Sequence, residues 1–189
     1  MTHGVDDHET VSIYPLDPDV LEKLLTTANE CVFNWVTKDS WPIGVIMSYV
    51  WHDGRIWLTA GAHRHRIAAI RRNPQVSVVV TSTGTSLGPA KTATIKGQCI
   101  IHEDRETKEW FYHALAFRNP NSAEAAAFEK RLNSPVRIVL EVVPVKWITF
   151  DGIKFAQDTA GTLPESAKGP KLSADADRLP RELKARGVS

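Results

Sequence analysis

Two arginines follow a run of small residues, in a pattern that suits the binding of an anion. Residues 59–62 (Thr-Ala-Gly-Ala) end an expected strand, and Arg64 and Arg66 fall in the first turn of a helix expected over 63–72. Positive side chains are unfavourable at a helix N-terminus, which already carries partial positive charge, unless an anion such as a phosphate binds there. Arginine suits phosphate because its planar guanidinium can bind two oxygens. Solvated surface charges would show the same spacing, so the pattern alone leaves both interpretations open.

The other chemically reactive residues form weaker patterns. His63 and His65 have an H-x-H spacing, but at a helix start they point in different directions and no third ligand accompanies them, so we expect no bound metal. Several histidines qualify as an axial ligand of haem, and none is distinguished by its surroundings. Cys31 and Cys99 each lie in an apolar run, which predicts buried and unreactive thiols.

The composition restricts the class of protein. The chain has 189 residues, with 23 Lys+Arg against 22 Asp+Glu and a formal net charge of +1, which argues against a nucleic-acid partner. No apolar run approaches the roughly 18 residues that span a bilayer, so we expect no membrane segment. The opening MTHGVDDHET is too polar for a signal peptide. These features predict a reduced, cytoplasmic protein.

Short runs rich in Val, Ile, Trp and Thr alternate with turn residues and predict β-strands over much of the chain. The dipeptide Asp53-Gly54 indicates a hairpin between two of these strands. The expected strands cover residues 31–39, 44–51, 55–60, 75–83, 91–103 and 135–152, the last bent at Pro144. Helices are expected at 17–29, 63–72, 104–116 and 121–131, with a weaker one near 180–186.

These elements predict a mainly β protein with peripheral helices (α+β), in which six to seven mostly antiparallel strands form a small barrel. A doubly wound parallel sheet does not fit, because no helix separates the first three strands and no GxGxxG follows a strand. The sequence divides into a flexible N-terminus (1–16), a barrel domain (17–156) and a polar C-terminal tail or lid (157–189).

The segment that carries the arginine pair resembles a known family. RIWLTAGAHRHRIAAIRRNPQVSVVV (55–80) is similar to the signature of the pyridoxamine 5′-phosphate oxidase-like superfamily of flavin-binding split β-barrels. That signature is a strand ending in Thr or Ser, small residues, a basic pair, a short helix, Asn/Asp-Pro and another strand. WVTKDSWPIGVIMSYVWHDGRIWLTA and KTATIKGQCIIHED resemble the family's flanking strands, so the likeness extends over about residues 17–151. It implies that residues 17–156 form a split β-barrel that binds flavin.

The resemblance also implies a cofactor site shared by two subunits of a homodimer. Arg64 and Arg66 would hold the cofactor phosphate, and the side of the phosphate and ribityl chain would be lined by Thr59 and Ala60. The remaining implied positions are Val45, Ile46, Met47 and Ser48 along the isoalloxazine edge, and Lys91 and Thr92, often from the second subunit.

Without the resemblance, several of these positions have a simpler, purely structural interpretation. Val45, Ile46 and Met47 fit the core of a strand, and Lys91 fits a solvated strand edge. If Lys91 faces the ring, its charge could stabilise the negative charge that reduced flavin carries near N1 and O2.

The function implied by the resemblance is FMN-dependent oxidoreduction of a small organic molecule, in which the cofactor carries the hydride. Two alternatives stay open: a reductase of the same fold that uses the deazaflavin coenzyme F420, and a non-catalytic flavin- or haem-binding protein. Activity on pyridoxamine phosphate is not expected, because residues 44–49 lack the Arg and Lys that true oxidases carry on this strand. No catalytic residue is assigned, and Tyr49 and Ser48 are the nearest candidates for a proton donor.

Overall fold

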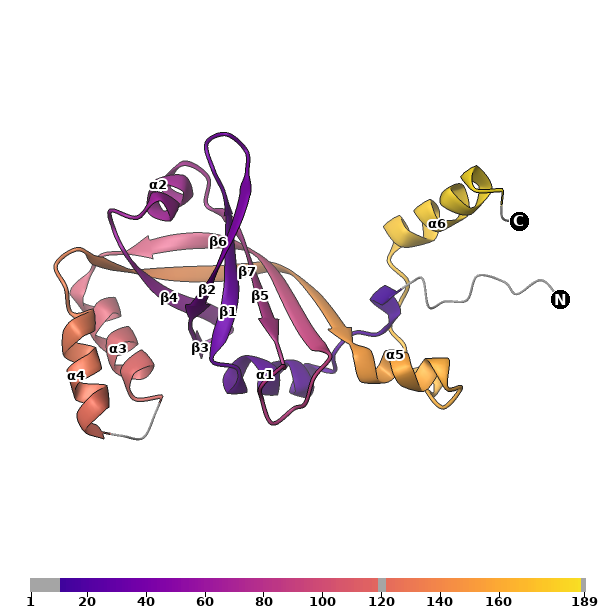
Figure 1. Cartoon of the computed structure of the whole chain (residues 1–189), viewed down its shortest axis with the longest axis horizontal. Coiled ribbons are helices and arrows are strands. Elements are labelled where there is room, and N and C mark those ends of the chain that lie inside the picture. The colour runs from indigo at the N-terminus through magenta and orange to yellow at the C-terminus, as the bar shows by residue number, and fades with distance from the viewer. Residues whose placement is uncertain (1–10, 119–121, 188–189) are drawn as a thin grey trace.

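A computed structural model describes residues 11–118 and 122–187, and its centre is a curled antiparallel β-sheet (Figure 1). Within these residues, seven strands pair in the order β2-β1-β5-β6-β7-β4-β3, and every pairing is antiparallel. The sheet forms a half-barrel, which confirms the predicted mainly β fold with peripheral helices. The strands are β1 (Glu30–Val36), β2 (Pro42–Ser48), β3 (Val50–His52), β4 (Arg55–Gly61), β5 (Gln75–Thr81), β6 (Lys91–His102) and β7 (Arg137–Asp151).

The helices lie around the sheet, and α3 and α4 form a hairpin at one end of it (Figure 1). Asp104 caps α3 by accepting a hydrogen bond from the Thr107 N–H at 2.8 Å, at the start of the helix expected over 104–116. No helix in the described part of the chain is long and apolar enough to cross a membrane. The helices are α1 (Pro18–Thr27), α2 (His65–Arg72), α3 (Arg105–Ala116), α4 (Ser122–Leu132), α5 (Gly152–Thr159) and α6 (Ser173–Ala185), with 3-10 turns η2 (Val11–Ile13) and η3 (Glu165–Ala167).

Apolar residues pack on both faces of β4, which explains why its sequence is almost continuously apolar. Leu58 belongs to the main core inside the curl of the sheet, together with Phe33 and Ile67. Trp57, the preceding residue, faces the other way and packs with Phe111 of α3. α3 therefore covers the outer face of the sheet where β3, β4 and β7 lie.

β7 is one long strand with a bend at Pro144, as the sequence predicts. Gly97 of β6 pairs with Pro144, whereas the preceding Lys96 pairs with Lys146, so the register shifts there by one residue. A proline has no N–H to donate, and a bulge is where a sheet tolerates one. A Cβ on Gly97 would lie 2.5 Å from Val142 Cγ1, so only glycine allows this close approach of the strands.

Two elements differ from the expectation. The strand expected over 44–51 is divided into β2 and β3 at Tyr49, whose ring is fully buried and whose hydroxyl donates to the Leu25 carbonyl oxygen at 2.7 Å. The helix α5 follows β7 directly, where no helix was expected. The buried carboxylate of Asp151 caps this helix by accepting from the N–H groups of Ile153 and Lys154.

The first described residues contact the segment that follows β7. The predicted flexible N-terminus covers 1–16; residues 1–10 lie outside the described residues, and within 11–16 the side chains of Ile13 and Tyr14 are buried. The Tyr14 hydroxyl donates to Asp158 Oδ2 at 2.6 Å, and the Gly169 N–H donates to the Ile13 carbonyl at 2.8 Å. Beyond this contact, α6 is longer than the helix expected near 180–186 and projects away from the barrel (Figure 1).

Candidate functional site

The arginine pair lies where β4 passes into α2. The Arg64 N–H donates to the Gly61 carbonyl at 3.0 Å, and the Ile67 N–H donates to the Arg64 carbonyl at 2.9 Å, which closes the first turn. Arg64 occupies the N-cap position, no side chain caps the helix, and its first turn contains no acidic residue. The first N–H groups of α2 therefore keep their partial positive charge, which favours an anion at this end.

The Arg66 side chain contacts an aromatic ring and a thioether instead of a carboxylate. Its guanidinium carbon lies 5.6 Å from the centre of the Trp35 ring on β1, and its Nη1 lies 3.5 Å from Met47 Sδ on β2. Partial burial, and then the charge of Arg64, lower the pKa of Arg66 below its ordinary value. Among the described residues, no acidic side chain pairs with this guanidinium. The structure thus brings two of the predicted positions, Arg66 and Met47, into contact.

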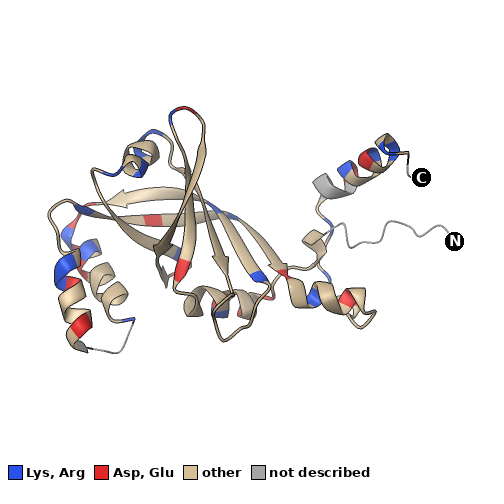
Figure 2. Ribbon diagram, in the orientation of Figure 1, with Lys and Arg blue, Asp and Glu red and all other residues tan. Residues whose placement is uncertain are grey.

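The arginines at the other end of α2 are engaged within the protein. Figure 2 shows α2 as a basic helix without acidic residues. Arg71 Nη2 lies 2.9 Å from Glu103 Oε1, and Arg72 Nη2 donates to the Val36 carbonyl oxygen at 3.5 Å. Arg64 is exposed, so it and Arg66 are the cations of α2 that remain available to an external anion.

The four predicted positions on β2 divide between the two faces of the strand. Val45 and Met47 pack against the main core, whereas Ile46 is 69% exposed and Ser48 is exposed. Within the described residues β2 is an edge of the sheet and pairs only with β1. An edge strand leaves backbone N–H and C=O groups free. The backbone of 45–48, more than its side chains, could therefore follow the polar edge of a planar ring.

Thr59 and Ala60 also face opposite sides of their strand. The Thr59 hydroxyl donates to the Ile138 carbonyl oxygen at 2.7 Å, and Ala60 is 5% exposed within the main core. The Thr59 hydroxyl is engaged with the backbone and Ala60 is packed in the core, so the contact of either residue with a cofactor stays a prediction.

Lys91 and Thr92 lie at the other end of the sheet from α2. Thr92 pairs with Thr81 at the end of β5, whereas α2 leads into the start of β5 at Gln75. These six residue steps span about 20 Å of extended chain. Lys91 is 7% exposed rather than solvated; its backbone is hydrogen-bonded to Ser82, and its ammonium has no partner in the described part of the chain. One chain alone does not bring these two residues to Arg66.

Comparison with known proteins connects this geometry to a family. The family profile described as pyridoxamine 5′-phosphate oxidase matches residues 18–150, which is more than half of the chain. The chain belongs to the pyridoxamine 5′-phosphate oxidase family. A search of curated proteins gave no match.

Solved structures share the fold of this pyridoxamine 5′-phosphate oxidase family member at low identity. A conserved hypothetical protein of Mycobacterium tuberculosis has a TM-score of 0.64 and 18% identity, with 74% of this chain and 88% of that chain covered. An FAD-binding protein of Mesorhizobium loti has a TM-score of 0.53 and 20% identity, with coverage of 71% and 92%. An F420 reductase has a TM-score of 0.50 and 20% identity, with coverage of 67% and 94%. At these identities the likeness concerns the fold alone.

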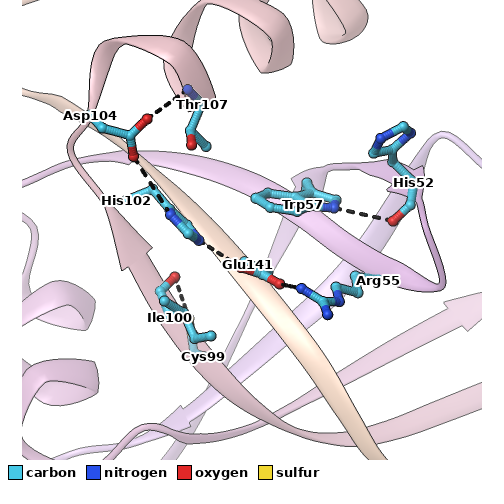
Figure 3. Close-up of polar contacts among 9 residues, drawn as sticks. All are labelled: His52, Arg55, Trp57, Cys99, Ile100, His102, Asp104, Thr107 and Glu141. Atoms are coloured by element: carbon cyan, nitrogen blue, oxygen red, sulfur yellow. Dashed lines mark hydrogen bonds and ion pairs between the residues drawn. The ribbon is translucent and has the colours of Figure 1, made fainter.

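A buried carboxylate on β7 was not singled out from the sequence. Glu141 is 3% exposed; one oxygen pairs with Arg55, and the other lies 2.6 Å from His102 Nε2 (Figure 3). The second ring nitrogen of His102 lies 3.7 Å from Asp104, the residue that caps α3. The signal in the sequence was a single Glu within the apolar run 138–143. In this family member the network links three strands to the start of α3.

Tyr49 and the two cysteines have structural surroundings. Burial raises the pKa of Tyr49, and its hydroxyl is engaged with the Leu25 carbonyl, so Tyr49 is not placed to donate a proton to a substrate. Burial raises the pKa of Cys31 and of Cys99 to about 12. The prediction of buried thiols is confirmed.

Proposed function

We propose that this chain is an FMN-dependent oxidoreductase that acts on a small organic molecule and binds its cofactor by the phosphate at the interface of a homodimer. The observation that carries the proposal is Arg66, a half-buried cation with no carboxylate partner among the described residues, in the first turn of a helix whose N-terminus no side chain caps. A desolvated cation is unfavourable unless an anion accompanies it, and the two features converge on one anion. Membership in a family that includes flavin-dependent oxidoreductases supports a flavin as the source of that anion.

The residues have distinct parts in this proposal. When bound, FMN supplies hydride transfer. Arg64 and Arg66 bind its phosphate, and the free backbone of β2 at 45–48 orients the polar edge of its ring. A buried ammonium such as Lys91, contributed by the second subunit, places positive charge where it favours the addition of hydride.

The homodimer is supported by the uncovered part of the sheet. The outer face that α3 leaves free carries apolar side chains with large exposed fractions: Val32 (36%), Ile46 (69%), Val145 (69%) and Ile148 (45%). Adjacent exposed apolar side chains on one face are typical of interaction surfaces. A second copy on this face would cover them, and it would also offer a route for Lys91 to reach the site of its neighbour.

Coenzyme F420 is the second candidate cofactor. The observation in its favour is the concentration of four arginines between residues 64 and 72 with no acidic residue among them (Figure 2). The polyglutamate tail of F420 is acidic, and such a helix would attract it.

The test is the identity and affinity of the cofactor. We expect the purified protein to quench FMN fluorescence on titration, and Arg66→Ala to weaken FMN affinity about 10- to 100-fold, because a hydrogen bond to a charged group is lost. Arg105→Ala is the control, since Arg105 is an exposed cation of α3 that pairs with Glu109. Tighter binding of F420 than of FMN would select the alternative. Uptake of haem without retention of any flavin would contradict both.

A further inference from the structure

A groove crosses the outer face of the sheet beside the bulge of β6 and β7. It has a volume of about 420 Å³, and its lining residues come from β2, β1, β5, β6 and β7, which are neighbours in the sheet (Figure 1). Adjacent strands lie about 4.8 Å apart, so five strands span about 19 Å and the groove is long and narrow. Its volume is in the range that small molecules occupy in proteins.

The charge in this groove is positive and has no counter-charge. Lys96 of β6 is the only charged residue among those that line the groove, and its ammonium has no hydrogen-bond or ion-pair partner within the described residues. Lys146 of β7 does not line the groove, but the register places it directly opposite Lys96, where it is exposed and equally unpaired. Like charges opposite each other on two strands are destabilising. An anion beside Lys96 would relieve this repulsion.

The polar side chains next to Lys96 offer hydrogen bonds to a ligand. Gln75 of β5 and Gln98 of β6 also line the groove and are partners in the register. Their side-chain amides make no hydrogen bond in the described part of the chain, so each keeps its donors and its acceptor. Asn34 of β1 is fixed instead, because its Nδ2 donates to the Ser77 carbonyl oxygen at 3.2 Å. The floor of the groove is therefore polar, without an acidic group.

The two ends of the groove are apolar. Val36 and Pro42 pair across β1 and β2 at one end, and Val145 of β7, which is 69% exposed, lies at the other. A simple anion would use Lys96 and leave these apolar ends uncovered. The shape and the two kinds of surface together fit an elongated molecule with one charged end.

We propose that this groove binds an elongated organic acid. Its carboxylate accepts a charge-assisted hydrogen bond from the Lys96 ammonium, and its apolar body extends across β5 and β1 towards Val36 and Pro42. The groove contains none of the residues assigned to the cofactor. The proposal therefore goes beyond the proposed function and does not depend on the identity of the cofactor.

The probe for this site is biphenyl-4-carboxylate, and its neutral analogue biphenyl-4-carboxamide is the matched ligand control. Each is titrated into the ¹⁵N-labelled full chain, and amide shifts are followed. We expect saturable shifts in β1, β5 and β6 with the carboxylate. The carboxamide should bind at least about 10-fold more weakly, because it lacks the charge that Lys96 recognises.

Two substitutions at exposed positions test the role of charge without disturbing the fold. Lys96→Gln should weaken carboxylate binding about 10-fold and leave carboxamide binding unchanged. Val145→Glu adds a negative charge to the groove and should also weaken binding of the carboxylate more than of the carboxamide. Lys23→Gln is the matched control, since Lys23 is an exposed lysine of α1 that does not line the groove.

Lys146→Gln gives a readout without ligand. It removes the charge opposite Lys96, so the variant should melt slightly above the unaltered protein at low ionic strength, and salt should reduce the difference. A lower melting temperature would show that Lys146 stabilises the fold and would contradict the unneutralised charge on which the proposal rests.

The proposal is overturned if the carboxylate gives no saturable shifts in these strands, or if the carboxylate and the carboxamide bind equally well. A second copy of the chain that fills the groove would give a different result: neither probe would bind, and the same amides would shift on dilution of the free protein. That outcome would overturn this proposal while supporting the homodimer of the proposed function.

Discussion

Glu141 shows how a single charged residue is accommodated inside the barrel wall. Its carboxylate is buried between Arg55 and His102, so both oxygens have a partner. A buried carboxylate without such partners would pay a large desolvation penalty. The residue therefore fixes the positions of β4 and β6 on either side of β7.

Glu141→Ala tests this role. We expect the free energy of unfolding to fall by about 1–3 kcal/mol, at the lower end of values for broken buried pairs because Arg55 and His102 retain access to water. Urea denaturation followed by tryptophan fluorescence measures it. The control is Glu109→Ala, which removes an exposed pair with Arg105 and should change stability little. Equal effects of the two substitutions would contradict the assigned role.

The cysteines make a second prediction at this scale. With pKa values raised to about 12, the thiols of Cys31 and Cys99 are almost wholly protonated at pH 8, and both are buried. The thiolate is the reactive form. The native protein should therefore react with Ellman's reagent only very slowly, and both thiols should react at once in urea. Rapid reaction of either thiol in the native protein would show that its side chain is accessible.

Individual residues differ in how well the sequence predicts them. The cap by Asp104 follows from local spacing, because neighbours within a few residues decide it. The availability of Arg66 does not, because its guanidinium lies against Met47 and Trp35, which are distant in the sequence. The burial of Lys91 and Glu141 does not follow, because alternation along a strand gives the face of a residue and not what covers that face. The engagement of Tyr49 with Leu25 likewise depends on how α1 packs.

At the scale of elements, the bend of β7 was predictable and the helix after it was not. Pro144 lacks an N–H, so the sequence alone places an irregularity there. Asp151-Gly152 has the composition of a turn, and the helix α5 forms because the ends of the chain pack against it, as the Tyr14–Asp158 hydrogen bond shows. Local composition decides the first feature and tertiary contacts decide the second.

Gly97→Ala tests the close approach of β6 and β7. A Cβ there would lie 2.5 Å from Val142 Cγ1 and 2.9 Å from the Val143 carbonyl oxygen, so the strands must separate. We expect a loss of about 1–3 kcal/mol in the free energy of unfolding, typical of overpacking. Lys96→Ala on the same strand, an exposed position, should have a much smaller effect in the same urea titration. Unchanged stability in Gly97→Ala would show that the bulge yields without strain.

For the whole molecule, the formal net charge of +1 is an average over unlike regions. Four arginines lie between residues 64 and 72 without an acidic residue, whereas the acids cap helices and pair with cations elsewhere. The sheet also separates the predicted cofactor positions, with Arg66 near one end and Lys91 at the other. The family resemblance implied that Arg66 and Lys91 both contact the cofactor. That they lie at opposite ends of the sheet in one chain is seen only in the structure.

The projecting α6 gives a prediction for the whole chain. Because this helix stands away from the barrel, a chain that ends at Leu172 should keep its melting temperature to within about 2 °C, a change below about 1 kcal/mol. Differential scanning calorimetry measures it, and the Ser12–Leu172 contact is retained. A large drop would show that α6 packs on the barrel, and a loss of FMN affinity at constant stability would identify 173–189 as part of a lid over the site.

The central claim is that the α2 arginines recognise the phosphate of a flavin. FMN and riboflavin share the ring and differ in that phosphate, so their affinities isolate its contribution. Fluorescence titration of the full chain should give an affinity for FMN at least about 10-fold higher than for riboflavin. In Arg66→Ala this preference should shrink while riboflavin binding stays unchanged. Equal affinities for FMN and riboflavin in the unaltered protein would contradict the account.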